Sequence, residues 1–507
     1  MTLTERLKGL APGRLKGIRR GIEKESLRVR PDGSLSQAPH PPALGSALTH
    51  PHITTDFSEA QLELITSPHP GVDACLAELA QIHQVVYRHI GEELLWAASM
   101  PCSLPSDSQI PIGRYGTSNV GRAKTVYRIG LSHRYGRRMQ AISGIHYNFS
   151  LPGVASEEYF ALIRNFRRHS WLPIYLFGAS PTVCTSFVNG RKHPLVELAP
   201  GTLYAPHATS LRMGPLGYQS DAQASLCVSY NSLDSYTASL YDALTKPYPE
   251  YEKLGIHNGD DYRQLSTTLL QIENEFYGTI RPKRRIKRGE RPLHALRSRG
   301  VEYVEVRLMD LDPFVPVGIT PATMRFLDVF LLHCLLSDSP QDTPREIGEI
   351  ARNQHAVALK GRETDLQLES DGKRLPLKAW GRTILGQCEP VAAALDAAHG
   401  GSSAHREALA EAASRLEDPE TTPSARVLHA MARNHENSFL RFVLIESTLH
   451  KGTLKTRELA RDAHERFARF AAESLDKQRE VEAADTMDFE SFRRQYLAQE
   501  LLGVMLR

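Results

Sequence analysis

Four short segments of the sequence alternate with a period of two, which is typical of β-strands. The first, GIEKESLRV at residues 21–29, would place Glu23 and Glu25 on one face, because side chains alternate across a strand. Similar segments are QLELIT from residue 61, GIHYNFS from residue 144 and VEYVEVRLMD from residue 301. In these three, an acid or a histidine lies on one face and apolar or aromatic residues lie on the other. The pattern predicts an antiparallel sheet with one apolar and one acidic face.

The acidic face has two interpretations. It could be exposed to water, as one face of an antiparallel sheet often is, and each strand alone fits this simpler interpretation. However, the polar positions are mostly Glu, Asp and His, which would repel one another unless cations neutralised them. Oxygen ligands with one imidazole suit Mg²⁺ or Mn²⁺, and two or three such ions beside arginines favour phosphoryl transfer. Arg307, on the same face as Glu305, either contacts the transferred group or forms a structural pair with that acid.

The composition is that of an ordinary globular protein. With 507 residues and a net charge of +3, the chain can form a large core and shows no overall bias toward polyanions. The first residues lack a signal-peptide core, and the most apolar segment, from residue 326, is too short for a membrane span. Six scattered cysteines without a CxxC pair predict reduced thiols, although spacing alone does not exclude a disulfide. We expect a cytoplasmic protein without membrane association.

The two parts of the chain differ in their patterning. Up to about residue 320, strand-like runs alternate with loops, whereas the remainder is rich in Ala, Leu, Glu and Arg. Apolar spacing predicts helices over 76–90, 159–166 and 459–475, a buried helix from residue 326, and breaks at GGSSAH (400–405) and DPETTP (418–423). We predict an α+β protein with a sheet-rich catalytic part at 1–335 and a mainly helical part at 336–507, packed together as one domain.

Eight separated blocks resemble the proteobacterial glutamate–cysteine ligase (γ-glutamylcysteine synthetase) family, and they occur in the order expected for it. The resemblance covers most of residues 15–335, whereas the last third matches loosely, through REVEAADTMDF from residue 479. The blocks are GIEKESLRV, ALGSALTHPHITTDFSEAQLELIT, YGTSNVGRAKTVYRIGLSHRYG, MQAISGIHYNFSLP, YLFGASP, YAPHATSLRMGPLGY, LQIENEFYGTIRPKR and GVEYVEVRLMDLDPF.

The resemblance implies a fold and a reaction. The fold would be similar to glutamine synthetase, with a curved, largely antiparallel sheet that forms a funnel-shaped active site surrounded by helices. ATP would phosphorylate the γ-carboxylate of L-glutamate, and the amine of L-cysteine would attack the γ-glutamyl phosphate. The products would be γ-glutamylcysteine, ADP and phosphate, in the first step of glutathione biosynthesis. Glutathione would be a feedback inhibitor. An alternative is a carboxylate–amine ligase that uses another amine.

The resemblance also implies roles for individual residues. Arg128 and Arg307 would hold the transferred phosphoryl group, and Arg212 would bind a carboxylate of glutamate. The ligands of two or three Mg²⁺ ions, for which Mn²⁺ could substitute, would be Glu23, Glu25, Asp56, Glu63, His146 and Glu305. The cysteine pocket would be shaped by Tyr127, Gln140, Tyr218 and Tyr277.

Two further segments have ordinary explanations. RPKRRIKRGERP at 281–292 is strongly basic and could bind nucleic acid, but it lacks interleaved aromatics. We favour a loop near nucleotide phosphates, and for most of its charges a solvated loop. GTSNVG at 116–121 could offer backbone N–H groups to an anion, although an ordinary turn is the default. We therefore expect no nucleic-acid partner. The sequence does not determine the oligomeric state, for which a monomer is the default.

Overall fold

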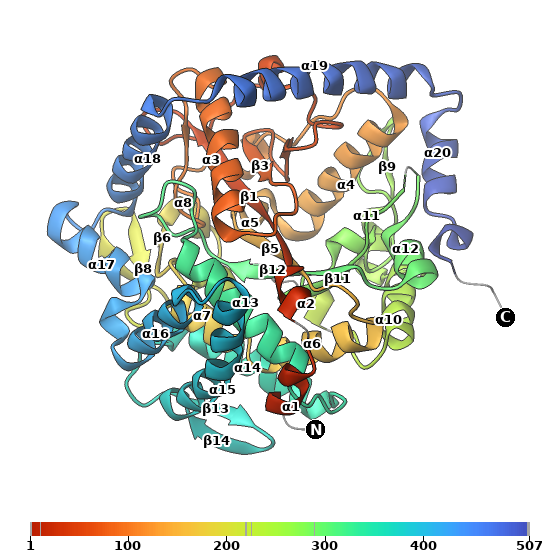
Figure 1. The fold of residues 1–507 in the computed structure, drawn as a ribbon. Helices are drawn as coiled ribbons and strands as arrows, with labels where there is room; N and C mark the ends of the chain where they lie inside the picture. Colours follow the sequence, from red (N-terminus) through yellow and green to blue (C-terminus); the bar gives the residue numbers. More distant parts are fainter. Residues whose placement is uncertain (1–2, 11, 218–220, 225, 288, 504–507) are drawn as a thin grey trace.

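A seven-stranded sheet lies within the part of the chain that the computed structural model describes, residues 3–10, 12–217, 221–224, 226–287 and 289–503 (Figure 1). The strand order is β11-β12-β5-β1-β3-β2, with β4 paired to β1, and neighbouring strands are antiparallel. The four segments predicted as strands form the consecutive set β12-β5-β1-β3. The strand bounds are β1 Arg19–Val29, β2 Ile53–Thr55, β3 Gln61–Ile65, β4 Leu94–Leu95, β5 Ile145–Ser150, β11 Ile280–Lys283 and β12 Tyr303–Met309.

The register of these strands separates an apolar face from an acidic face. On the apolar face Tyr147 lies opposite Ile22 and Val306, and all three side chains are buried. On the other face Glu23 lies opposite His146, and Glu25 lies opposite Glu63 on β3. The predicted alternation is confirmed, and it places acids from three strands side by side.

Three helices pack on the sheet and build the main core. The predicted helices appear as α3 Val72–His89, α6 Ser156–Arg168 and α13 Pro321–Leu336. α13 contacts both α3 and α6, and α3 and α6 contact the strands. The apolar residues of all three helices belong to the same buried cluster as the apolar sheet face. All residues of 326–336 are buried, as expected for the most apolar segment. Within the described ranges, every helix is too short or too polar to cross a lipid bilayer.

The chain after α13 is mainly helical, as predicted. The breaks at 400–405 and 418–423 separate α15 from α16 and α16 from α17, and α19 begins at Arg461, two residues after Leu459. One core cluster extends from Leu7 to Leu502 and thus includes both parts of the chain. The division near residue 335 stays a prediction. The elements are α14 Pro344–Lys360, β13 Gln367–Ser370, β14 Lys373–Pro376, α15 Leu377–Ala398, α16 Ala404–Glu417, α17 Pro423–Asn434, α18 Phe439–Thr456, α19 Arg461–Ala483 and α20 Phe489–Tyr496.

The remaining elements surround the sheet. A second, three-stranded sheet has the order β6-β8-β7, and β9 and β10 form a hairpin. The bounds are α1 Leu3–Lys8, α2 Pro12–Lys16, α4 Asn119–Tyr135, α5 Arg137–Gln140, α7 Trp171–Phe177, β6 Thr182–Cys184, α8 Thr185–Val188, β7 Val196–Ala199, β8 Thr202–Tyr204, α9 Asp221–Ala224, α10 Leu233–Thr245, α11 Pro249–Leu254, β9 His257–Asn258, β10 Asp261–Tyr262 and α12 Pro292–Arg299.

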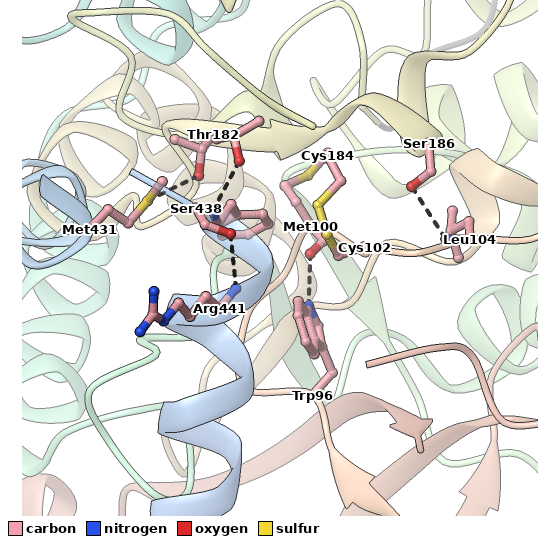
Figure 2. The surroundings of a disulfide bond; sticks show 12 residues. Trp96, Met100, Cys102, Leu104, Thr182, Cys184, Ser186, Met431, Ser438 and Arg441 are labelled. Atoms are coloured by element: carbon pink, nitrogen blue, oxygen red, sulfur yellow. Dashed lines mark hydrogen bonds between the residues drawn. A yellow bond between two sulfur atoms is a disulfide. The ribbon is translucent and has the colours of Figure 1, made fainter. Parts of the chain in front are cut away.

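A disulfide joins Cys102 to Cys184, so the prediction that all six cysteines are reduced is wrong for this pair (Figure 2). The two residues are 82 positions apart, and their Cα atoms lie 5.2 Å from each other because the segment after β4 runs beside β6. Spacing in the sequence carries no signal of such a long-range pair. The other cysteines are free, and all of them are buried except Cys227, which is exposed.

Candidate active site

Three side chains on the acidic face form a cluster that could bind a cation. Glu23, His146 and Glu305 each offer a ligand atom, and these atoms all lie within 4.8 Å of one another. His146 Nδ1 lies 3.2 Å from Glu23 Oε2, and His146 Nε2 lies 3.5 Å from Glu25 Oε1. Asn148 Nδ2 donates to Glu23 Oε1 at 2.9 Å and orients that carboxylate. Two carboxylates with one imidazole suit a hard divalent cation.

Glu25, Glu63 and Asp56 form the other half of the acidic face. Burial and the nearby Asp56 carboxylate raise the pKa of Glu25 to about 8, despite a 2.7 Å hydrogen bond from Gly144 N. Burial and the surrounding acids, Glu23 first, raise the pKa of Glu63 well above its usual value. Such carboxyls hold protons that a divalent cation would displace. The donor set of this half therefore also fits a divalent cation.

Glu305 differs because basic side chains surround it. Lys283 Nζ donates to Glu305 Oε1 at 3.1 Å, and Arg307 Nη1 donates to Oε2 at 2.9 Å. Burial alone would raise the pKa of Glu305, but Lys283 and Arg307 hold it well below the usual range. The pKa of Glu23 is also lowered: burial and Glu305 raise it, but the hydrogen bond from His146 and the charge of Lys283 outweigh them. These two acids are therefore ionised at neutral pH.

Lys283 was missed by the sequence reasoning, which treated 281–292 as a loop. Residues 281–283 instead belong to β11, where Arg281 pairs with Glu305 and Lys283 with Tyr303. Arg281 and Arg291 are buried, and Arg291 forms an ion pair of 2.6 Å with Glu273. Part of the basic segment is thus internal, whereas Arg285 and Lys287 are exposed. The absence of a nucleic-acid partner stays a prediction.

Arg212 and Arg307 lie side by side at one end of the acidic face. Arg212 Nη2 donates to Arg307 O at 2.8 Å, and Arg212 Nη1 lies 3.8 Å from Asp310 Oδ1. Asp310 is itself held by Ser210 Oγ, which donates to it at 2.9 Å. A Cβ atom on Gly144 would lie 2.0 Å from Arg212 Nη2, so only glycine lets the guanidinium lie this close. Asp310 and Gly144 were not anticipated from the sequence.

Arg128 reaches the opposite end of the face from α4. Its guanidinium donates to the backbone oxygen of Asp56, and its Cζ lies 4.5 Å from the centre of the Tyr115 ring. Lys124, one turn earlier, also lies over that ring, at 5.1 Å. Burial and the charge of Arg128 lower the pKa of Lys124 to about 8. Arg128 thus lies at one end of the acids and Arg307 at the other.

A cavity of about 350 Å³ opens from the acidic face. His146, Arg212, Tyr277 and Arg307 line it, so four of the predicted residues share it. Its volume lies at the lower end of the range for small-molecule sites. The rest of the lining mixes polar side chains, among them Arg167, Gln223, Gln354 and His355, with the apolar side chains of Met213, Leu226, Val228, Phe276, Ile347 and Ile350.

The other residues predicted for the cysteine pocket lie near Tyr277. Gln140 Nε2 donates to the Tyr277 hydroxyl at 2.7 Å. Burial, together with the neighbouring Glu275 and Tyr277, raises the pKa of Tyr127. Tyr218 lies outside the described residues. The structure thus brings Tyr127 and Gln140 close to Tyr277, which lines the same cavity as Arg212 and Arg307.

An open antiparallel sheet with acids and arginines on one face and helices on the other defines a glutamine-synthetase-like ligase. The family model of glutamate–cysteine ligase matches residues 8–155 and 153–357. Because these matches cover more than half of the sequence, the chain belongs to the glutamate–cysteine ligase family and is an enzyme.

Individual relatives agree with this assignment over nearly the whole chain. The glutamate–cysteine ligase of Alcanivorax borkumensis is 48% identical over 96% of this chain and 97% of its own length. The ligase of Saccharophagus degradans is 47% identical, with 96% and 95% covered. Among solved structures, glutamate–cysteine ligase from Francisella tularensis in complex with AMP gives a TM-score of 0.90 at 37% identity, covering 95% of this chain and 97% of that one. A bifunctional glutathione synthetase from Pasteurella multocida gives 0.72 at 25% identity, covering 93% and 58%.

Proposed function

We propose that the enzyme ligates the γ-carboxylate of L-glutamate to the amine of L-cysteine with cleavage of ATP. The observation that carries the proposal is the acidic sheet face, which has an arginine at each end and a cavity of small-molecule size beside it. Family membership and the AMP bound to the Francisella relative support it. The reaction would begin glutathione biosynthesis in the cytoplasm, in a monomeric enzyme that glutathione inhibits.

The reaction proceeds in two steps. A γ-carboxylate oxygen of glutamate attacks the terminal phosphorus of ATP, the bond to the bridging oxygen breaks, and ADP leaves. The amine of cysteine, having lost a proton, then attacks the γ-carbonyl carbon of γ-glutamyl phosphate, and phosphate leaves. Activation is necessary because a carboxylate is a poor electrophile. Two or three Mg²⁺ ions, or Mn²⁺ in their place, would neutralise the nucleotide phosphates.

The side chains divide this work between them. Arg128 and Arg307 stabilise the charge on the phosphoryl group as it moves between oxygens. Arg212, held against Gly144 and Asp310, binds a carboxylate of glutamate. The residues that shape the cysteine pocket are Tyr127, Gln140, Tyr218 and Tyr277. The ligands of the cations are Glu23, Glu25, Asp56, Glu63, His146 and Glu305.

A coupled assay of ADP release tests this proposal. The purified enzyme is supplied with ATP, Mg²⁺ and glutamate, and the amine is cysteine, alanine, 2-aminobutyrate or ammonia. We expect turnover to be highest with cysteine and γ-glutamylcysteine to be found by mass spectrometry. If alanine or ammonia supported equal turnover, the enzyme would be a carboxylate–amine ligase with another acceptor.

A further inference from the structure

Two carboxylates from the C-terminal part of the chain contact the N-terminal end of α4. Glu482, near the end of α19, accepts a hydrogen bond of 2.8 Å from Thr117 N, and Asp485 accepts one from Asn119 N. The first N–H groups of a helix have no partner within the helix, and negative charge there also interacts favourably with the helix dipole. The backbone donors of GTSNVG thus bind an anion that the protein itself supplies.

The contact is close, and several groups make it. A Cβ atom on Gly116, whose φ is +81°, would lie 2.3 Å from Glu482 Oε1 and from Gln478 Nε2. Asn119 Nδ2 donates to Met487 O at 2.9 Å. The hydrogen bond from Thr117 N lowers the pKa of Glu482, so the carboxylate is ionised at neutral pH.

Apolar packing continues this contact along α4. Phe489, at the start of α20, is buried against Ala123 and Val126 of α4. The guanidinium carbon of Arg122 lies 4.5 Å from the centre of the Phe489 ring. Figure 1 shows α19 running along the edge of the molecule and α20 turning down from its end, and α20 contacts α4. The α19–α20 segment therefore fixes the outer side of α4.

The inner side of α4 faces the acidic sheet. Arg128 donates to the backbone oxygen of Asp56, and a Cβ atom on Gly121 would lie 2.2 Å from Tyr115 O. Arg128 is nine residues after Asn119, which is about 14 Å along a helix. A tilt at the first turn of α4 would therefore displace Arg128 and its neighbour Tyr127 from the acids.

We propose that Glu482 and Asp485 are positioning residues for the ligase reaction. They hold the first turn of α4 in the place where Tyr127 and Arg128 face the cysteine pocket and the transferred phosphoryl group. This inference rests on the proposed function, through the roles of those two side chains. It also gives the C-terminal segment a task in the reaction although the segment contributes no residue to the cavity wall.

The test compares three variants of the full chain. The double variant Glu482→Ala/Asp485→Ala removes both acceptors, and Glu482→Gln/Asp485→Asn keeps an acceptor oxygen at each position. The control Glu480→Ala removes an exposed carboxylate from the same helix. We expect the alanine pair to raise the KM for cysteine and lower kcat, by at least about fivefold in kcat/KM. The KM for glutamate should stay within about twofold, because Arg212 is held elsewhere. The amide pair, Glu482→Gln/Asp485→Asn, should retain most of the wild-type kcat/KM for cysteine.

Hydrogen exchange of residues 119–131 supplies a readout that does not depend on turnover. Faster exchange there in the alanine pair, with wild-type exchange in Glu480→Ala, is the expected result. The inference is wrong if α4 exchanges at the wild-type rate in the alanine pair. It is also wrong if the folded alanine pair keeps the wild-type kinetic constants, or if the amide pair loses as much as the alanine pair. Failure of the wild-type enzyme to use cysteine would overturn the proposed function alone.

Discussion

The two halves of the acidic face differ in their surroundings. Around Glu23 and Glu305, the cations Lys283 and Arg307 and the histidine His146 lower the pKa values of the acids. Around Glu25 and Glu63, burial and neighbouring acids dominate, and both pKa values are raised. The same residue type on the same sheet face is thus ionised on one side and inclined to hold a proton on the other.

This difference indicates which half of the acidic face requires a bound cation to balance its charge. The Glu305 half already has protein cations and can attract and orient phosphate groups before any metal binds. The Glu25 half gains charge compensation only from a bound cation, because the sheet brings its acids together without enough basic partners. Metal binding should therefore depend most strongly on pH in the Glu25 half.

The largest expected effect distinguishes carboxylates on the acidic face of the sheet from a carboxylate that points away from it. Glu23→Ala or Glu63→Ala should lower kcat/KM for ligation by about 100-fold or more, because on the proposed function each removes a ligand of a cation that would neutralise the phosphates. Steady-state ADP release measures the loss.

Glu302→Ala is the matched control for both substitutions. Glu302 lies just before β12, with its side chain directed to Arg284 and away from the acids. The activity of the Glu302→Ala variant should stay within about twofold of the wild type, as for most surface substitutions. Equal losses in all three variants would show that the face a carboxylate occupies does not matter.

The sequence predicted the sheet better than it predicted the electrostatics of the site. Period-two alternation is a local signal, so β1, β3, β5 and β12 could be read directly, together with the face that each acid occupies. The alternation also made Arg307 a candidate, whereas the roles of Arg128 and Arg212 came from resemblance to a family.

The residues that the sequence missed share a physical reason. Lys283, Asp310 and the Cys102–Cys184 pair act through partners that tertiary packing brings close. Glu482 and Asp485 also contact α4 across more than 360 positions. No local period encodes such contacts, and only the folded arrangement shows them.

The second prediction compares two variants, one in each half of the acidic face, by their free energies of unfolding in the absence of divalent cations. At pH 7 in a chelator, Glu305→Gln removes the carboxylate to which Lys283 and Arg307 donate and leaves them with the charge of Glu23. The substitution should cost about 2 kcal/mol, less than for fully buried partners because both cations are partly exposed. Glu63→Gln places a neutral amide where burial already favours the neutral acid, so stability should change little or increase. Urea unfolding gives both values. A similar destabilisation of both variants would remove the distinction between the halves.

The third prediction concerns the pH dependence of Mg²⁺ binding. Burial and the Asp56 carboxylate raise the pKa of Glu25 from the ordinary value of 4.5 to about 8 in the fold. Between these values the folded metal-free protein keeps a proton that the unfolded chain has lost, so this group makes stability fall as pH rises. Because Mg²⁺ requires the carboxylate, its affinity should increase with pH up to about 8, by up to about tenfold per pH unit for one displaced proton.

Thermal unfolding with increasing Mg²⁺ at pH 6.5, 7.2 and 8.0 measures this change in affinity. Glu25→Gln, which has no carboxyl to titrate, should bind Mg²⁺ more weakly and with a shallower pH dependence. The Glu23→Gln variant removes an acid that is already ionised and should keep the wild-type slope while losing affinity. If wild-type affinity were constant from pH 6.5 to 8.0, the Glu25 half would already be ionised without metal. The two halves of the face would then be electrostatically alike.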